Sequence, residues 1–242
     1  MFMKLFDQQA YKIHQKRALG SFHKHDFLFQ HVGYDLTSRL QDIKRNFKNS
    51  LNLSPHPLNS LNLTNTSLEN FQDFPADSFD LIFSCLLGHS LENLPEFLRQ
   101  VHRCLQPDGL FLAAILGGNT LVELRDSLLQ AELSMKGGAS PRVSPMVHPK
   151  DATQLLSRAG FILPVVDTET ITVTYPTLFS LMRDLRGMGE TNILNDRVKS
   201  FTPRGLFEKA EEIYRKEYGF NGEKLPATFE VIYLTGWGNP QA

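Results

Sequence analysis

The stretch Phe79-Asp-Leu-Ile-Phe-Ser84, followed later by Leu110-Phe-Leu-Ala-Ala-Ile-Leu116, decides the fold. Both runs are largely apolar and short enough for strands, and such runs are typical of parallel sheets that helices cover. Between them, residues 92–105 place apolar side chains at helical spacing, and Gln106-Pro-Asp-Gly109 predicts a turn. Strand, helix, turn and strand form a βαβ unit, so we expect an α/β fold with a parallel sheet covered on both faces.

The remaining patterns extend this unit in both directions. Residues 58–72 are rich in Leu and Asn and suit either a short strand or an irregular packed loop. Gly160 is expected to end a helix. The other expected helices are 2–18, 27–47, 120–134, 149–159, 176–186 and 203–217, and the other expected strands lie near 51–53, 161–166, 171–175 and 229–235.

The chain is expected to form one domain over residues 1–242, because it contains no repeat and no low-complexity linker. Within it we expect amino-terminal helices over 1–48, a reduced α/β core over 49–118, and further helices with carboxy-terminal strands over 119–242.

Composition excludes several classes of protein. The 242 residues are 41% hydrophobic with a formal net charge of −1, which argues against disorder and against a strongly basic nucleic-acid binder. Cys85 and Cys104 form neither a disulfide framework nor a metal-type spacing. The start lacks the apolar region of a signal peptide, and no run reaches the length of a membrane span. We therefore expect an untargeted, soluble intracellular protein without a membrane span.

Several motifs narrow the fold to one family. The chain opens with Leu5-Phe-Asp7 and Lys16-Arg-Ala18, and the βαβ unit contains Leu105-Gln-Pro-Asp-Gly-Leu110. Four later segments are Leu116-Gly-Gly-Asn-Thr-Leu-Val-Glu-Leu-Arg125, Gly137-Gly-Ala-Ser-Pro-Arg-Val-Ser-Pro145, Leu181-Met-Arg-Asp-Leu-Arg-Gly-Met-Gly-Glu-Thr-Asn192 and Ala227-Thr-Phe-Glu-Val-Ile-Tyr-Leu-Thr-Gly-Trp237. Together they resemble the arginine-hydroxylase assembly factors of mitochondrial respiratory complex I and their alphaproteobacterial relatives. The chain is similar, more distantly, to the carrier-protein methyltransferase of biotin synthesis.

This resemblance implies a class I S-adenosylmethionine-dependent methyltransferase fold with a Rossmann-like sheet. It implies S-adenosylmethionine as cofactor, methylation or another modification of a protein arginine as activity, and a subunit of complex I as partner. It also implies a mitochondrial matrix location in a eukaryote and a cytoplasmic one in a bacterium, where peripheral membrane association is compatible with the sequence.

The sequence departs from the family pattern where the cofactor would lie. The family has a Leu-Asp-Leu-Gly-like start to a glycine-rich loop, whereas this chain has Leu51-Asn-Leu-Ser-Pro-His-Pro57 and no glycine from Tyr34 to Leu87. Glycines allow backbone to approach such a cofactor closely, and prolines remove N–H donors. The 25 residues from 54 to 78 are also too few for the two helices and two strands of the full fold. We therefore expect a degenerate cofactor loop and a sheet truncated by one or more strand-helix units in its amino-terminal half.

Three residues are candidate contacts of the cofactor. Glu69 is the acid between Asp42 and Asp73 and corresponds to the family's acidic stretch beside the adenine. Ser84 ends the first buried strand, and His89 follows it where the family has a His-Trp pair. The alternative for His89 is a hydrogen-bonded histidine at the approach to a helix. No catalytic residue and no complete set of metal ligands is identified.

Other polar residues have a structural and a functional interpretation. Gly117, Gly118, Asn119 and Thr120 either place donors near a ligand or form a turn in which Asn119 or Thr120 caps a helix, and we favour the cap. An exposed helix face is expected for Glu123 and Arg125. His23 and His25 have chelate spacing without a third ligand, so a surface role is favoured. The cluster Arg183, Asp184, Arg186 and Glu190 suits a partner-binding lid or an ion-paired helix end.

Three functions remain open at this point. The first is a cofactor-dependent enzyme that modifies a protein arginine. The second is a catalytically inactive relative that serves as a scaffold or chaperone in complex I assembly. The third is a small-molecule binding protein.

Overall fold

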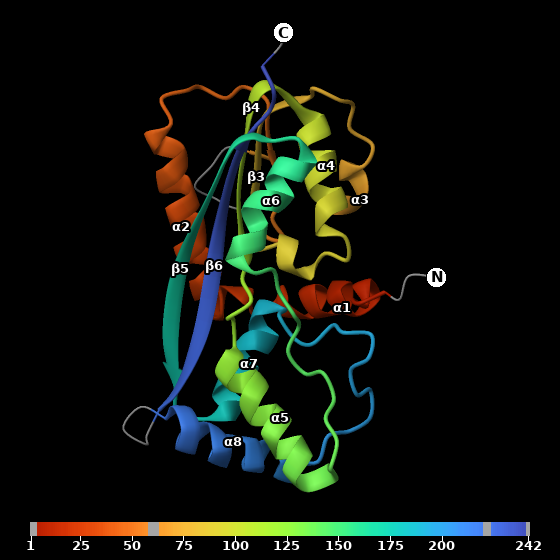
Figure 1. Cartoon of the computed structure of the whole chain (residues 1–242), viewed down its shortest axis with the longest axis vertical. Coiled ribbons are helices and arrows are strands. Elements are labelled where there is room, and N and C mark those ends of the chain that lie inside the picture. Colours follow the sequence, from red (N-terminus) through yellow and green to blue (C-terminus); the bar gives the residue numbers. More distant parts are fainter. Residues whose placement is uncertain (1–3, 58–62, 220–223, 241–242) are drawn as a thin grey trace. The chain divides into compact units, whose positions relative to one another are not determined.

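The computed structural model describes residues 4–57, 63–219 and 224–240, which divide into two compact units (Figure 1). We call them the helix unit and the sheet unit. The single-domain expectation stays a prediction. Within the described residues, the helix unit comprises Met1–Asp26, Asn119–Met146 and Thr170–Glu230, and the sheet unit comprises Phe27–Gly118, Val147–Glu169 and Val231–Ala242.

The described residues form one six-stranded sheet in the order β2-β1-β3-β4-β6-β5. Neighbouring strands from β2 to β4 are parallel, whereas β6 is antiparallel to β4. The sheet is therefore mixed, and the expectation of a wholly parallel sheet is wrong at β6, because an apolar run does not reveal strand direction. The strands are β1 Ser50–Asn52, β2 Thr64–Asn65, β3 Phe79–Cys85, β4 Leu105–Leu116, β5 Ile162–Tyr175 and β6 Leu225–Trp237.

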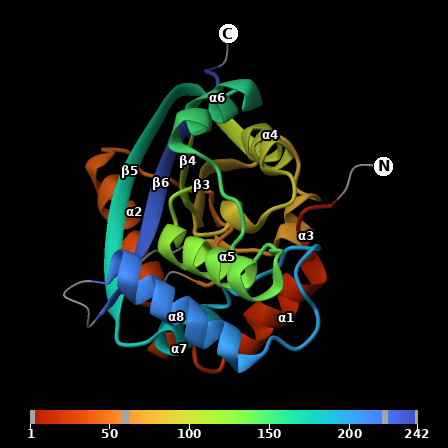
Figure 2. The same ribbon diagram turned by 60° about the horizontal axis from the view of Figure 1, so that its bottom comes forward.

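The predicted βαβ unit is confirmed as β3, α4 and β4. Helix α4, Leu94–Cys104, begins after Asn93, whose side chain accepts a hydrogen bond from the Glu96 N–H. Every residue of β3 is buried. Helices α4 and α6 (Pro149–Ala159) lie on one face of the sheet and α2 (Phe27–Asp42) lies on the other (Figures 1 and 2). The core under α4 and α6 includes Leu51, Ile82, Leu98, Val101, Phe111, Leu156, Phe161 and Ile232.

Several boundaries differ from the sequence expectation. Helix α1 is Gln8–Ala18 rather than 2–18, because the Asp7 carboxylate accepts the Ala10 N–H and starts the helix there. Helix α2 ends at Asp42 rather than at residue 47. The predicted turn at 106–109 lies inside the bounds of β4 but interrupts its pairing with β3. Leu105 lies opposite Phe79, the next paired residue is Leu110 opposite Leu81, and Asp108 between them has φ of 57°. The two strands expected over 161–175 form the single strand β5.

The short interval from 54 to 78 carries little regular structure. Its described residues contain β2 and the one-turn helix α3, Leu68–Phe71, which Ser67 caps. Residues 58–62, part of the segment left open between strand and loop, lie outside the described residues. The truncation relative to the family fold stays a prediction.

In the helix unit, α5 (Val122–Lys136) packs beside α8 (Arg204–Tyr218), and α1 packs beside α7 (Leu178–Met188), as Figure 2 shows. The first turn of α7 is closed by a capping box between Thr177 and Ser180. A small core joins the amino-terminal segment of this unit to the segment after α7: Phe6, Ala10, Tyr11, Ile193 and Leu194.

Within the described residues, every helix is too short or too polar to cross a lipid bilayer.

Gly160 gives a test of the predicted helix end. It caps α6 with φ of 105°, and a Cβ there would lie 3.0 Å from the His102 ring. We expect Gly160→Ala to lower the free energy of unfolding by about 1 kcal/mol or more, measured by urea denaturation. The control is Gly205→Ala in α8, where no atom lies within 4 Å of the added Cβ. An unchanged stability of Gly160→Ala would contradict this assignment.

Candidate functional site

The carboxyl ends of β1, β2 and β3 meet at one edge of the sheet, which is where α/β proteins bind ligands. Asn52, the last residue of β1, is 1% exposed there. Its Nδ2 donates to Asn65 Oδ1 at 2.7 Å, and its Oδ1 accepts from the Ser54 backbone N–H at 3.0 Å and from the Ser54 hydroxyl at 2.6 Å. The same Ser54 Oγ accepts the Cys85 N–H at 2.8 Å. We call Asn52, Ser54, Asn65 and Cys85 the strand-end cluster.

An aromatic contact lies beyond the strand-end cluster. His56, between two prolines, is 6% exposed and meets the Phe29 ring edge-on at 5.6 Å between ring centroids. The Cys85 thiol points to the Phe29 carbonyl at 3.9 Å. Burial raises the pKa of this thiol, so the nucleophilic thiolate is disfavoured. The strand-end cluster is therefore a polar network whose members bond to one another; Asn52 and Cys85 are buried in it, Ser54 is half-buried and Asn65 is exposed.

The structure places the three candidate cofactor residues in different surroundings. Ser84 lies within β3, opposite Ala113 of β4, and is 2% exposed. His89 lies in a single turn, η2 (Gly88–Ser90), and is 6% exposed. Glu69 lies in α3 with its side chain exposed to solvent. A role of these residues in cofactor binding stays a prediction.

The expected helix cap at Asn119 or Thr120 is wrong. Asn119 donates its backbone N–H at 3.1 Å and its side-chain amide at 2.7 Å to the Glu230 carboxylate. The Thr120 hydroxyl donates to the Glu230 carbonyl and accepts the Glu230 N–H. The residue before α5 is Leu121, which has φ of 55° and makes no side-chain cap. These polar side chains thus fasten the segment to β6 rather than to the helix.

Glu123 also differs from the expectation of an exposed face. It is 6% exposed, and its carboxylate accepts hydrogen bonds from the Thr228 hydroxyl and N–H. Arg125 is half-buried and donates to the Thr120 carbonyl at 3.3 Å. The first turn of α5 therefore faces β6 within the helix unit.

The cluster in and after α7 contains one closely held carboxylate. Asp184 lies 2.5 Å from His25 Nδ1 and accepts the Tyr175 hydroxyl at 3.0 Å. Burial, with the nearby Asp184, raises the pKa of Tyr175 and keeps it protonated. His25 is half-buried rather than at the surface, while His23, Arg183 and Arg186 are exposed. These contacts support the ion-paired helix end, and the lid stays a prediction.

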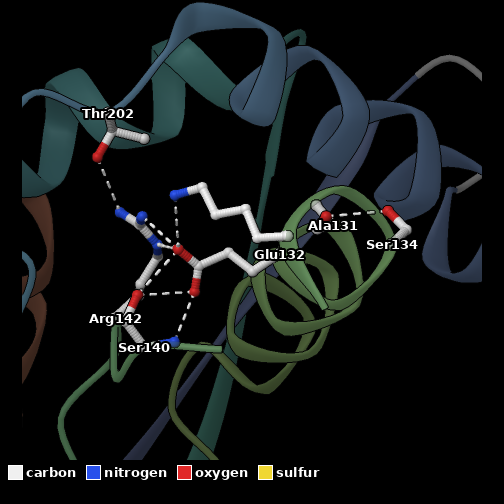
Figure 3. A network of polar contacts seen from close by, with 7 residues as sticks. Ala131, Glu132, Ser134, Ser140, Arg142 and Thr202 are labelled. Atoms are coloured by element: carbon white, nitrogen blue, oxygen red, sulfur yellow. Dashed lines mark hydrogen bonds and ion pairs between the residues drawn. The ribbon is translucent and has the colours of Figure 1, made fainter. Parts of the chain in front are cut away.

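Sequence reasoning missed the most tightly held carboxylate of the helix unit, which Figure 3 shows. Glu132 of α5 is 1% exposed. Its Oε2 accepts the backbone N–H and the hydroxyl of Ser140, each at 2.7 Å. Its Oε1 accepts from Arg142 Nη2 at 2.6 Å, and Arg142 Nη1 donates to Thr202 at 3.3 Å. Glu132 comes four residues after the buried Leu128, so it lies on the same face of α5. A carboxylate on that buried face needs a cationic partner, and this was the signal in the sequence.

The electrostatics of Glu132 follow from these bonds. Burial by itself would raise its pKa, but the hydrogen bonds from Arg142 and Ser140 outweigh burial and lower the pKa from 4.5 to about 2. The network therefore binds residues 140–142, part of the motif that carries the family resemblance, to α5.

Glu132→Gln tests this network. We expect the variant to lose about 3 kcal/mol of unfolding free energy at pH 7. Since the pKa is lowered by folding from 4.5 to about 2, the contribution is present above pH 4.5 and fades as the pH falls toward 2. Urea denaturation across this range should show the two proteins converging. Glu208→Gln, which removes an exposed pair with Arg204, serves as control and should change stability by less than about 1 kcal/mol. A constant difference at all pH values would refute the assignment.

Comparisons with known proteins agree with the geometry of the sheet. A family model described as a methyltransferase domain matches residues 18–113. The solved structure of the YcgJ protein from Bacillus subtilis superimposes with a TM-score of 0.52 at 11% identity, covering 86% of this chain and 99% of that one. A solved structure from Bacillus halodurans gives a TM-score of 0.50 at 13% identity, with coverage of 86% and 99%. These likenesses show a class I methyltransferase fold of the Rossmann-like type.

Curated relatives are much closer in sequence. Arginine-hydroxylase NDUFAF5, mitochondrial, from Danio rerio is 36% identical over 268 residues, covering 97% of this chain and 83% of the relative. The Homo sapiens protein of that name is 37% identical, with coverage of 88% and 70%. Malonyl-(acyl-carrier protein) O-methyltransferase from Xylella fastidiosa is 37% identical over 160 residues, which cover 66% of this chain and 52% of that protein. The chain therefore belongs to the family of the mitochondrial arginine hydroxylase NDUFAF5, within the class I methyltransferase fold.

Proposed function

We propose that this protein acts in the assembly of respiratory complex I by binding a protein subunit of that complex. The observation that carries the proposal is the similarity to the arginine hydroxylases, 36% identity over 97% of the chain. That coverage includes both compact units, so the likeness extends beyond the sheet that many methyltransferases share. The proposed location is the one named for these relatives, mitochondrial, or the cytoplasm of a bacterium. In this proposal, any peripheral association of the protein with a membrane is through the complex I subunit that it binds.

The family implies S-adenosylmethionine, and the residues present do not fit that cofactor in the family manner. The acid and the first glycine of the family loop are Asn52 and Ser54 here. The side chains of Asn52 and Ser54 are already bonded to each other, to Asn65 and to the Cys85 N–H. A ligand that displaced them would leave buried polar groups without partners, which costs about 1–3 kcal/mol for each group. The strand-end cluster thus supports a protein that does not use this cofactor site.

The lengths of the aligned chains support the same proposal. The Danio rerio relative aligns over 268 residues, more than this whole chain of 242 contains. The relative therefore has residues in the aligned region that this chain lacks. A short interval between β1 and β3, with a two-residue strand and a four-residue helix, is where we propose the reduction lies.

Two candidate functions share this partner and differ in their chemistry. In the first, the protein modifies an arginine of the bound subunit, as the names of its relatives state for them. In the second, it binds the subunit as a catalytically inactive scaffold or chaperone. The strand-end cluster favours the scaffold, because its polar groups bond to one another, whereas group transfer requires a rigid cradle that aligns cofactor and substrate.

Calorimetry with S-adenosylmethionine tests whether the protein binds this cofactor. We expect no saturable heat for the full chain, corresponding to a Kd weaker than about 1 mM. The Xylella fastidiosa methyltransferase, 37% identical over the matched region, is the matched positive control in the same buffer. A saturable isotherm with a micromolar Kd would overturn the cofactor part of the proposal and leave the role in assembly intact.

Complementation tests the role itself. Human cells that lack their own NDUFAF5 protein should regain assembled complex I when this chain is directed to their mitochondria, and a complex I subunit should co-purify with it. Mass spectrometry of that subunit then separates the two chemistries, since hydroxylation adds one oxygen atom to an arginine and a scaffold adds none. If a stably expressed protein neither restores the complex nor captures a subunit, the proposed role is wrong.

A further inference from the structure

A cluster of one imidazole and two carboxylates lies in the sheet unit, away from the strand-end cluster in sequence. His31 and Asp35 come from α2 and Glu169 comes from β5. One ligand atom from each of the three residues lies within 4.8 Å of the others. We propose that His31, Asp35 and Glu169 bind a divalent transition-metal ion.

Local structure brings these three groups together. His31 and Asp35 are four residues apart on α2, so their side chains project from the same face, one turn apart. His31 Nε2 lies 2.8 Å from Glu169 Oε1 and 3.9 Å from Asp35 Oδ2. Paired ligands four residues apart on a helix are a common metal-binding arrangement. A third ligand from another element completes a set that can hold one side of an ion.

The hydroxyl of Tyr233, in β6, contacts both carboxylates. Tyr233 is 1% exposed, and its hydroxyl lies 3.0 Å from Asp35 Oδ2 and 2.8 Å from Glu169 Oε2. A phenol has a single proton, so it satisfies only one of the two carboxylates at a time. The Glu169 oxygen that faces His31 is the one that Tyr233 does not use. The tyrosine therefore orients the ligands and leaves a site for a further positive charge.

The charges around the cluster favour a cation. Among the described residues, His31 is the sole ion-pair partner of Asp35 and of Glu169. The nearby Arg39 pairs instead with Asp167 at 2.6 Å and lies over the Tyr233 ring at 4.2 Å. Two carboxylates thus face one imidazole without a lysine or arginine to neutralise them. The side chains of His31 and Asp35 are 47% and 33% exposed, so an ion can reach them from solvent.

The donor set selects the class of ion. One imidazole nitrogen with carboxylate oxygens suits Mn²⁺, Fe²⁺ or Zn²⁺ better than the all-oxygen sites of Ca²⁺ or the thiolate sites of soft metals. Three protein ligands leave positions open for water. The alternative is a plain ion pair that joins α2 to β5, and it makes a different prediction for added metal.

Metal titration of the full chain, freed of metal with a chelator, distinguishes these alternatives. We expect one saturable Mn²⁺ site by electron paramagnetic resonance, and Zn²⁺ should compete for it. Glu169→Gln should abolish the site. Asp167→Asn is the matched control, because it removes a neighbouring carboxylate of the same strand that pairs with Arg39 and lies outside the cluster; it should bind Mn²⁺ as the natural protein does.

A variant of the supporting tyrosine gives a second, milder test. Tyr233→Phe keeps the ring and removes the hydroxyl, so the protein should fold while its Mn²⁺ affinity falls about 10–100-fold. Circular dichroism establishes that each variant is folded. Absence of a saturable Mn²⁺ or Zn²⁺ site in the natural protein, or equal binding by Glu169→Gln, would overturn the metal site and leave the ion pair as the explanation.

Discussion

The arrangement of the sheet unit depends on β3, a strand with no exposed residue. A strand buried on both faces must satisfy its backbone groups through neighbours on both edges, and β1 and β4 supply these bonds. Pairing with β1 brings Asn52 beside the end of β3, and pairing with β4 orders the segment that leads to η2. The strand-end cluster is thus a consequence of how β3 is buried.

The sequence predicted the parts of the fold that local physics determines. The βαβ unit was evident from two apolar runs around an amphipathic helix, and Gly160 was correctly expected to end a helix. The turn predicted at 106–109 corresponds to an irregularity inside β4, where the pairing with β3 passes from Leu105 to Leu110. The direction of β6 could not be predicted from the sequence either, because the long-range pairing with β4 decides it.

The candidate site was less predictable for the same reason. Asn119 and Thr120 follow a local rule for helix caps, yet Glu230, which lies 111 and 110 positions later, takes their hydrogen bonds. Glu132 and the pair of His31 with Glu169 likewise depend on partners from other elements. The degenerate loop after β1 was predicted from residue types alone, because prolines and absent glycines constrain the backbone wherever they lie, and it stays a prediction.

Membership of the arginine-hydroxylase family is compatible with a strand-end cluster whose polar groups bond to one another. Protein binding can use surfaces of both units, whereas methyl transfer needs a particular cradle at the sheet edge. The proposed scaffold role therefore requires partner recognition and not that cradle. The proposed metal site uses residues that the strand-end cluster does not contain.

Both cysteines lie in the sheet unit, and neither side chain reaches solvent. Burial raises the pKa of Cys85 and of Cys104, so the reactive thiolate is scarce as well as shielded. Alkylating reagents can therefore modify these thiols only when β3, which contains Cys85, or α4, which contains Cys104, opens transiently. The rate of alkylation of the two cysteines therefore measures the frequency of local unfolding, without any engineered label.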